Sequence, residues 1–588
     1  MTTPSLFPAE SVIARDLGAR GSRADVASAD PAAELSPTAA AVLAAIPTWW
    51  RAQATAAGLE GDWLDVHRAI DAKSPINLGP DLALDAAWGA LAPEDVGLAY
   101  VSALSAATRA RHGRHYTPTI LAERLWAMAR NALGHGQRSA QLTRLVRDPA
   151  CGGGALLLPA LREHLAASHR VDPQMVMAGL PNLIEGVDAD PAAVWVANVV
   201  LAAEVLPVLA RVPERRRRPL PALARVADGL APGERRAHVT LMNPPYGRVR
   251  LSAEDRTRFA NVLYGHANLY GLFLGAALEE LRDDGVLAAL VPTSFTSGRY
   301  FTKLRAEMAR LAPLRDVTFL TKRDGVFSSV LQETCLAVFT RQPSRRTTVS
   351  NMDVGAPAPT ATSVASVKAH YSDGPWVLPR RPDDAPIAAA ASRMPMTLGG
   401  AGWSASTGPL VWNRRRSDLH ARSANGRLRV VWAADLDGGI LHRDKARSAM
   451  RFLKIRNEGD RAVMALTEPA ILVQRTTAPE QHRRLVATEL TAADLALEGG
   501  AVVVENHVNV LRPRDAPLLS RHLLARLLST RTVDQLTRCI SGSVALSAYE
   551  LESLPLPGAE VLESWEPLAD LALEQAVAAA YRPGASPA

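Results

Sequence analysis

Residues 238–246 of the chain read His-Val-Thr-Leu-Met-Asn-Pro-Pro-Tyr. The run before Asn243 is rich in aliphatic and β-branched residues, which is typical of a buried strand that ends where the prolines begin. Pro244 and Pro245 each fix their own φ and have no N–H to donate, so they form a stiff turn whose carbonyls stay unengaged. We therefore expect a rigid loop of hydrogen-bond acceptors at the C-terminal tip of a strand.

This loop has the chemistry of a site for an amino-bearing base. The side-chain oxygen of Asn243 and the backbone carbonyl near Pro244 can accept both hydrogens of an exocyclic amine, while Tyr246 offers an aromatic face to a planar base. A simple strand followed by an Asn-Pro turn is the alternative. Because all four residues follow an apolar strand, we favour the functional interpretation.

A second loop, Asp148-Pro-Ala-Cys-Gly-Gly-Gly154, follows a predicted strand at 142–146 and precedes a predicted helix at 155–167. Three glycines let a ligand approach the backbone closely, and Asp148 can reach ammonium or hydroxyl groups of that ligand. The loop lacks the GxGxxG spacing of dinucleotide sites and the GK[ST] of P-loops, which argues against NAD and ATP. A nucleoside ligand without phosphates is preferred.

Two further predicted strands end in acids. Residues 183–188 end at Asp188, the usual position for binding ribose hydroxyls, and residues 223–227 lead to Asp228. Nearby Asp190 is expected to cap the helix that begins at Pro191. With Asp148 and Asn243, four consecutive strand tips would line one crevice of a parallel α/β sheet.

Tyr116-Thr117-Pro118 precedes a helical pattern at 121–133, and Thr117 or Thr119 is placed to cap that helix. Taken alone, the segment is only a helix start.

In kind and order, these motifs resemble the catalytic domain of the DNA adenine-N6 methyltransferases, of the gamma class typified by the TaqI enzyme of restriction-modification systems. The resemblance covers residues 114–340 and implies a Rossmann-like fold that binds S-adenosylmethionine. It implies catalytic roles for Asn243, Pro244 and Tyr246, and stacking of Tyr246 and Phe327 on a flipped adenine, with no metal. The cofactor-binding positions that it implies are Tyr116, Thr117, Pro118, Asp148, Ala150, Gly152, Gly154, Asp188 and Asp228.

The 588 residues, 48% hydrophobic and 21% charged, are enough for three or four domains. Proline, threonine and serine dominate after about residue 341, which suggests a linker. We expect the following division: a weakly ordered segment at 1–40, a helical N-terminal domain at 41–110, the methyltransferase domain at 111–345, a linker and domain entry at 346–398, and an α+β target-recognition domain at 399–588.

In the C-terminal part, residues 408–413, 470–477 and 501–509 are predicted strands with polar tips. They resemble, more loosely, the target-recognition half of the same methyltransferases. We predict DNA contacts for Gln474, Arg475, Asn506 and His507, although each could equally be a strand-end residue that is hydrogen-bonded within the fold.

Composition sets limits on partners and location. The net charge is +7 with 66 basic residues, almost all arginine, which permits nucleic-acid binding, although a GC-rich genome would produce the same bias. The basic run 214–218 is predicted to be a solvated loop, with phosphate contact as the alternative. Three dispersed cysteines suggest neither a disulfide framework nor a zinc site. We expect a cytoplasmic protein with no apolar run of membrane-spanning length.

The resulting hypothesis is a site-specific adenine DNA methyltransferase that acts on double-stranded DNA in a restriction-modification or related phage-defence system, with a separately encoded nuclease or defence partner. No nuclease motif accompanies Lys73, the lysine of the N-terminal region. The alternatives are methylation of cytosine N4, of RNA or of protein glutamine, and a non-catalytic DNA-binding subunit.

Overall fold

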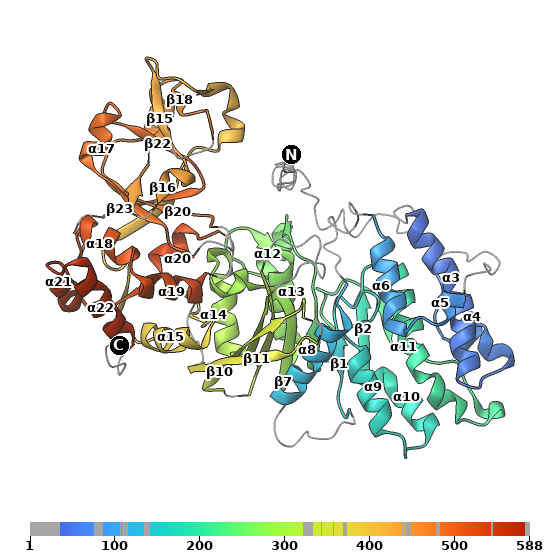
Figure 1. Cartoon of the computed structure of the whole chain (residues 1–588). Helices are drawn as coiled ribbons and strands as arrows, with labels where there is room; N and C mark the ends of the chain where they lie inside the picture. Colours follow the sequence, from blue (N-terminus) through green and yellow to red (C-terminus); the bar gives the residue numbers. More distant parts are fainter. Residues whose placement is uncertain are drawn as a thin grey trace, which may run out of the picture.

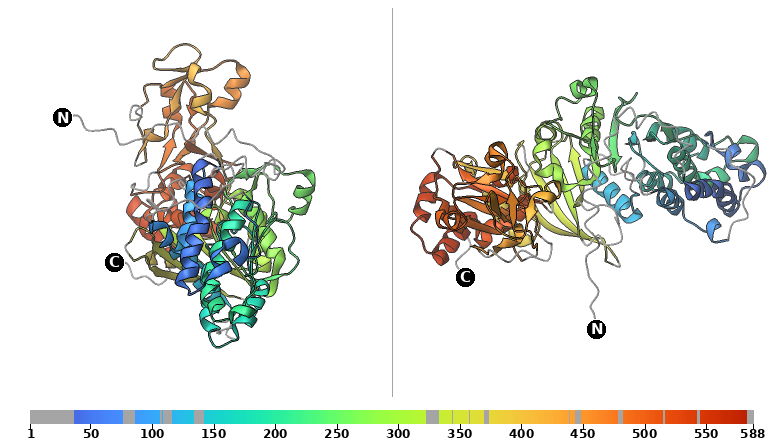
Figure 2. Two further views of the ribbon diagram at one scale, coloured as in Figure 1. Left: turned by 90° about the vertical axis from the view of Figure 1, so that its right-hand side faces the viewer. Right: turned by 90° about the horizontal axis from the view of Figure 1, so that it is seen from above.

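The computed structural model has three consecutive parts: N-terminal helices, a large sheet with its helices, and a C-terminal domain (Figure 1). Seen from above, they follow one another in a row (Figure 2). The structure describes residues 36–75, 86–105, 108, 116–133, 142–321, 333–342, 344–356, 358–368, 373–437, 439–442, 448–477, 482–514, 516–541 and 545–582. The predicted weakly ordered segment falls almost wholly outside these residues.

A nine-stranded sheet forms the centre of the molecule, in the order β11-β10-β8-β9-β7-β4-β1-β2-β3. The five strands from β7 to β3 are mutually parallel, whereas β9 runs antiparallel to both β7 and β8. The strands are β1 Val146–Asp148, β2 Ile184–Asp188, β3 Ala224–Val226, β4 Ala237–Met242, β7 Leu281–Pro292, β8 Leu314–Thr321, β9 Thr334–Thr340, β10 Arg346–Asp353 and β11 Ala361–Lys368. The chain order reverses on either side of β1, and such a switch point is where α/β sheets bind ligands.

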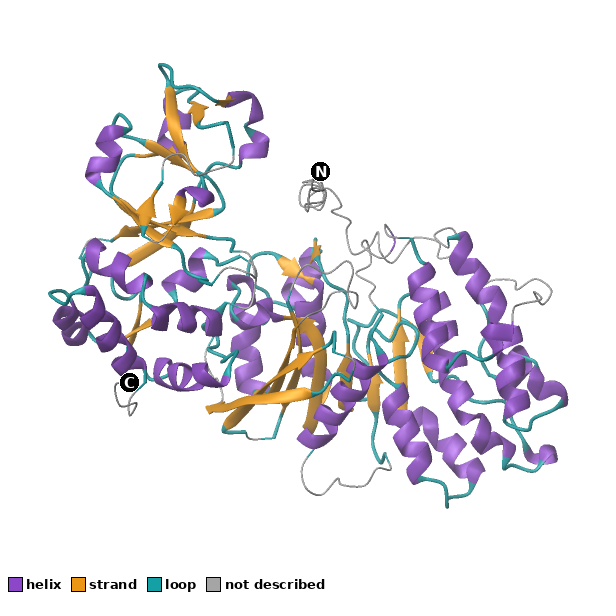
Figure 3. Ribbon diagram, viewed as in Figure 1, coloured by secondary structure: helices purple, strands orange, loops and turns teal. Residues whose placement is uncertain are grey.

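Helices cover both faces of this sheet (Figure 3). Strand β7 shows why, because its successive side chains point to opposite faces. Val286, Ala288 and Leu290 belong to the core formed with α8, α9 and α11, whereas Leu287, Ala289 and Val291 belong to the core formed with α13 and α14. The helices of this region are α8 Thr119–Ala132, α9 Leu158–Ala167, α10 Pro173–Leu183, α11 Pro191–Ala210, α12 Ala253–Arg258, α13 Leu269–Glu280 and α14 Thr302–Leu311, and a two-stranded ribbon joins β5 Arg248–Val249 to β6 Ala267–Asn268.

The N-terminal helices share one hydrophobic core with the sheet, so they differ from the separate domain expected at 41–110. They are α3 Pro37–Ala56, α4 Val66–Ala69, α5 Ala86–Gly89 and α6 Pro93–Ala103. Trp49 and Trp50 of α3 are fully buried in this core. Helices α3 and α6 pack against α11, beside which Figure 1 shows them.

Helix α11 is the centre of this shared core. By length and composition it could cross a membrane, contrary to the sequence expectation, but 89% of its apolar window is buried inside the protein. Its neighbours therefore cover the apolar surface that lipid would otherwise meet. Asp190 caps its first turn by accepting a hydrogen bond from the Ala192 N–H at 2.9 Å, as predicted.

The linker predicted at 346–398 is wrong, because β10 and β11 extend the central sheet. Val349 and Met352 of β10 are buried, and β10 pairs in parallel with β8. The threonines and serines that suggested a linker are instead strand residues, and threonine is a good strand former. Further along, α15 (Ala385–Ala391) packs on the C-terminal helices, so the C-terminal domain begins before residue 399.

The described part of the C-terminal domain combines helices with two larger sheets, ordered β13-β23-β20-β21 and β14-β18-β15-β22-β19, and with the two-stranded sheets β12-β24 and β16-β17. The predicted strand at 408–413 is absent, since that stretch makes one bridge at Leu410 and a turn of 3₁₀ helix. The helices are α16 Glu458–Met464, α17 Ala492–Leu497, α18 Arg521–Leu528, α19 Arg531–Ile540, α20 Ala548–Glu552, α21 Ala559–Trp565 and α22 Asp570–Tyr581. The strands are β12 Met396–Thr397, β13 Trp403–Thr407, β14 Leu419–His420, β15 Arg427–Val431, β16 Leu436–Asp437, β17 Ile440–Leu441, β18 Phe452–Lys454, β19 Ala465–Leu466, β20 Ala470–Gln474, β21 Ala487–Leu490, β22 Val502–Val504, β23 Val508–Pro513 and β24 Pro555–Leu556.

Helix α20 joins this domain to the segment that follows β7. The Ser297 hydroxyl donates to Glu550 at 2.6 Å, and both residues are buried. The guanidinium of Arg305, which is 0% exposed, binds the Phe295 and Gly298 carbonyls and lies 3.4 Å from the Tyr549 hydroxyl. These polar contacts fix α20 against the end of β7.

We predict that Tyr100→Phe destabilises the protein by loosening α6 from α11. The Tyr100 hydroxyl donates to the Asp190 carboxylate at 2.8 Å in a buried setting. Hydrogen bonds to charged groups contribute about 1.5–3 kcal/mol, so the variant should lose stability of that order in urea unfolding. Unchanged unfolding would mean that this bond does not hold the N-terminal helices.

Candidate active site

The glycine loop after β1 is held by backbone contacts and keeps one face open. The Cys151 N–H donates to the Val187 carbonyl at 2.9 Å, and the Gly152 N–H donates to Asp188 Oδ2 at 2.9 Å. Gly152 has φ +49°, and a Cβ built there would meet no atom within 4 Å. A ligand can therefore approach this turn without meeting a side chain.

Gly154 serves packing instead. Its φ is +86°, and a Cβ there would lie 3.4 Å from Ala197 of α11, so a side chain at this position would be strained and crowded. This glycine brings the loop against α11, whereas Gly152 leaves open space beside the loop.

The three strand-tip acids lie in different environments. Asp188 is partly buried and accepts the N–H groups of Gly152 and Asp190, both at 2.9 Å. Asp228 is exposed and accepts the Leu230 N–H at 2.9 Å. The backbone thus holds both carboxylates in place at the crevice edge of the sheet.

Asp148 differs from the expected ligand contact. It is 1% exposed, and its carboxylate accepts the Ala150 N–H at 3.0 Å, which closes the turn of the glycine loop. Burial, and secondarily the neighbouring Asp188, raises the pKa of Asp148 to about 8. In the structure the buried Asp148 side chain stabilises the turn of the glycine loop.

At the tip of β4, the Asn243 carboxamide is bound at both ends. Its Nδ2 donates to the Thr117 hydroxyl at 3.0 Å, and its Oδ1 accepts the Tyr246 hydroxyl at 2.9 Å. The Tyr246 hydroxyl also lies 3.1 Å from the Leu290 carbonyl of β7, and the ring of Tyr246 meets Tyr270 edge-on at 6.1 Å. Burial raises the pKa of Tyr246 far above its usual range, so this hydroxyl stays a donor.

The segment Tyr116-Thr117-Pro118 brings the start of α8 into the site. Thr117 is 5% exposed and does not cap α8, whose N-cap is Pro118 without a side-chain bond, so the capping prediction is wrong for Thr117. Its hydroxyl instead accepts a hydrogen bond from Asn243, a contact that no sequence pattern predicted. Tyr116 donates through its hydroxyl to the Glu94 carbonyl at 2.7 Å, so α6 positions this ring.

The structure therefore brings together the predicted residues of the methyltransferase part, apart from Phe327, which lies outside the described residues. Among the described residues, no group of three or more His, Cys, Asp or Glu side chains is arranged to hold a metal ion. Cys151, Cys335 and Cys539 are buried and unbonded to one another.

In the C-terminal domain, Gln474 differs from the predicted DNA contact. It is 7% exposed, and its amide donates to the carbonyls of Ala433 and Leu436 at 2.8 and 3.0 Å, so it stabilises the fold from within.

The other three candidates form one cluster at the β22–β23 turn. The Arg475 N–H donates to the His507 carbonyl at 2.7 Å, and its guanidinium lies 3.4 Å from the Asn506 carbonyl. The exposed His507 ring binds Glu505 at 2.6 Å, and this hydrogen bond raises the pKa of the imidazole. DNA binding by these residues stays a prediction.

The sheet order, with its switch point at β1, defines a Rossmann-like α/β fold. The fold is similar to that of the type IIL restriction-modification enzyme MmeI, solved in complex with DNA, with a TM-score of 0.51 at 14% identity over 91% of this chain and 87% of that one. The predicted α/β fold is confirmed.

Residues 236–327 match the model of the Eco57I restriction-modification methylase family. It is 26% identical over 334 residues to the Type II methyltransferase M.PstI of Providencia stuartii, and 23% identical over 349 residues to M.BsuBI of Bacillus subtilis. These matches cover 55% and 57% of this chain, and 65% and 68% of the relatives. The resemblance to restriction-modification methyltransferases is confirmed for this domain.

We predict that Asp148→Asn changes how stability depends on pH. Because the native pKa is about 8, the folded protein keeps a proton that the unfolded chain loses near pH 4. Stability from this group is therefore full below about pH 4 and is lost as pH rises to about 8. The unfolding temperature of the variant relative to the native protein should rise between pH 5 and 8 and then level off. A difference between the two proteins that stays constant from pH 5 to 8 would mean that Asp148 is already ionised in the folded protein.

Proposed function

We propose that this protein transfers the methyl group of S-adenosylmethionine to the N6 of an adenine flipped out of double-stranded DNA. The observation that carries the proposal is the Asn243 carboxamide, held between Thr117 and Tyr246 at the tip of β4 beside the open glycine loop. We further propose that it is the cytoplasmic modification component of a restriction-modification or phage-defence system, with a separately encoded nuclease or defence partner.

The residues at the crevice suit this cofactor. The exposed side of Gly152 gives close backbone approach, Asp188 stands at the ribose position of the second strand, and Asp228 stands at the next strand end. Tyr116, Thr117 and Pro118 would close the other side. Bound there, S-adenosylmethionine supplies a methyl group on a sulfonium, and the protein supplies orientation and electrostatics.

Asn243 acts on the target amine through its oxygen. Because Thr117 accepts from Nδ2, the carboxamide cannot turn over without losing that bond, and Oδ1 keeps its direction. Oδ1 and the Pro244 carbonyl would each accept one N–H of the adenine amine. This withdraws the nitrogen lone pair from conjugation with the ring and leaves it directed at the methyl group, an effect that matters most as the new bond forms.

Tyr246 would serve the base in two ways. Its hydroxyl holds Asn243 and anchors to the Leu290 carbonyl of β7, which fixes the loop before the base arrives. Its ring would stack on the extruded adenine, and each base–aromatic contact is worth about 1–3 kcal/mol against the cost of unstacking. The C-terminal domain would read the sequence around that base.

The direct test is mass spectrometry of nucleosides from plasmid DNA treated with the purified protein and S-adenosylmethionine. N6-methyladenine is the expected product, and N4-methylcytosine would replace the adenine assignment. Methylated RNA or protein with unmodified DNA would overturn the choice of substrate.

In the same assay, Asn243→Ala should lower the transfer rate by about 100-fold or more, as for loss of an oriented group that acts in the transition state. Cofactor affinity, measured by calorimetry, should stay near that of the native protein, because the contact forms with the amine. Transfer at the native rate would contradict the role of Asn243.

Thr117→Val should test the bond that orients Asn243. The change leaves a partly buried amide donor without its hydroxyl partner, at a cost of about 1–3 kcal/mol, so we expect kcat to fall about 10- to 100-fold. Thr117→Ser, which restores the hydroxyl, should recover most of the rate. Equal activity in the valine and serine variants would show that the hydroxyl does not matter.

A further inference from the structure

An exposed group of cations and aromatic rings lies on segments next to Tyr246, the residue proposed to stack on the target base. It consists of Arg248, Arg250, Tyr264, His266, Arg299 and Tyr300, which we name the Arg–Tyr patch. All six side chains are exposed, with Tyr264 at 39% and Tyr300 at 42%. The methylase chemistry proposed above uses none of them.

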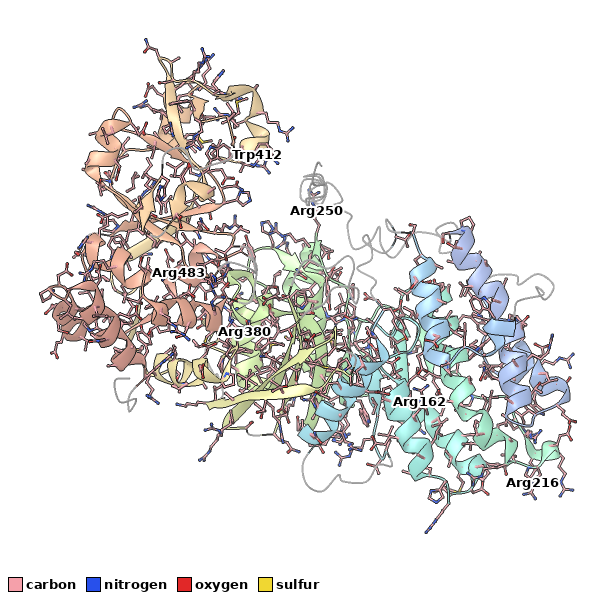
Figure 4. The ribbon with its side chains drawn as sticks, viewed as in Figure 1. Arg162, Arg216, Arg250, Arg380, Trp412 and Arg483 are labelled. Atoms are coloured by element: carbon pink, nitrogen blue, oxygen red, sulfur yellow. The ribbon has the colours of Figure 1, made fainter. Side chains whose placement is uncertain are left out.

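The six residues of the patch come from three short segments, 248–250, 264–266 and 299–300. Arg248 follows Tyr246 by two residues and lies on β5, and β5 pairs with β6, where the chain enters α13 and Tyr270. Side chains alternate along a strand, so Arg248 and Arg250 share the outer side while Val249 packs inward. Figure 4 shows Arg250 at the upper edge of the methyltransferase part.

The rings hold the cations in place. The Arg248 guanidinium lies 5.8 Å from the centroid of Tyr300, and His266 meets the same ring at 5.4 Å. The Arg299 guanidinium lies 5.8 Å from the centroid of Tyr264 and donates to its hydroxyl at 3.3 Å. Within the described part of the chain, none of the three arginines forms an ion pair with a carboxylate. Glu552 acts on Arg299 electrostatically without forming a close ion pair. The stacked guanidiniums of Arg248 and Arg299 therefore keep N–H donors for an external anion.

The patch also reaches the boundary with the C-terminal domain. Arg299 and Tyr300 lie in a 3₁₀ turn, Arg299–Phe301, directly after Ser297, which binds Glu550 of α20. Tyr300 is thus fixed between the pocket and the domain proposed to read the sequence. A strand that delivers a base to Tyr246 has to cross this surface, because the extruded nucleotide stays attached to its two neighbouring phosphates.

We propose that the Arg–Tyr patch binds the sugar-phosphate backbone of the target strand next to the flipped nucleotide, with Arg248 and Arg299 as the phosphate ligands. Guanidinium groups bind phosphate through paired N–H donors, and such contacts position a duplex without reading its sequence. This inference rests on the proposed DNA substrate. It assigns these residues to positioning the strand at the pocket, separate from both methyl transfer and sequence recognition.

The test compares Arg248→Gln, Arg299→Gln and the double variant with the native protein. Binding to a duplex that carries the methylated motif, and to an unrelated duplex, is measured by fluorescence anisotropy from 50 to 300 mM salt. Loss of one phosphate contact should reduce the slope of log affinity against log salt by about 1, and the double loss by about 2, with both duplexes weakened alike. The variants should methylate the same DNA sequence motif as the native protein.

Arg170→Gln is the matched control, because Arg170 is also exposed but lies between α9 and α10, outside the patch. Its salt slope should equal that of the native protein. Tyr300→Ala should weaken binding like Arg248→Gln, whereas Tyr300→Phe keeps the ring and should bind normally. Unchanged unfolding temperatures and cofactor affinities would confirm that these surface variants are intact.

A native slope in the double variant would overturn the proposal, as would a relaxed motif, which would indicate base contacts. These outcomes are distinct from failure of the proposed function, because in that case the native protein itself would not methylate DNA.

Discussion

The hydrogen-bonded chain from Thr117 through Asn243 and Tyr246 to Leu290 is the constraint on which the site depends. It joins the start of α8, the tip of β4 and the strand β7, and Thr117 and Asn243 are 126 residues apart in sequence. The contacts fix both the direction of the Asn243 oxygen and the stiffness of its loop before any ligand arrives. Without a fixed carboxamide, the two prolines would position only a backbone carbonyl.

The same arrangement explains why local sequence patterns predicted much of the site. In the sequence, an apolar run that ends in an acid, an asparagine or a glycine loop indicates the end of a strand. Parallel strands bring these ends to one edge of the sheet. The Thr117 contact has no such signal, because a threonine before a helix looks like a cap wherever its hydroxyl points. Asp148 likewise has the sequence pattern of a cofactor-binding residue, and only the structure shows that its carboxylate is buried.

Outside the motifs, amino-acid composition predicted the structure less well than the motifs predicted the site. Residues 346–368 are rich in threonine and serine, yet β-branched threonine and buried Val349 place them in the sheet. The N-terminal helices were predicted from their own periodicity, but which surface they cover depends on α11, which lies far from them in the sequence. A polar strand end such as Gln474 gives the same pattern whether its partner is DNA or a backbone carbonyl.

The junction at α20 has a consequence for building hybrid enzymes. Replacing the C-terminal domain as a unit would treat it as independent of the rest of the chain, yet the Glu550 carboxylate belongs to that domain and the Ser297 hydroxyl to the segment after β7. A replacement domain without an acceptor at that position would leave the buried Ser297 hydroxyl without its hydrogen-bond partner. Arg305 would then face a surface to which it is not matched. When a replacement domain is chosen, the identity of the residue that it places opposite Ser297 should therefore count for more than its overall sequence similarity.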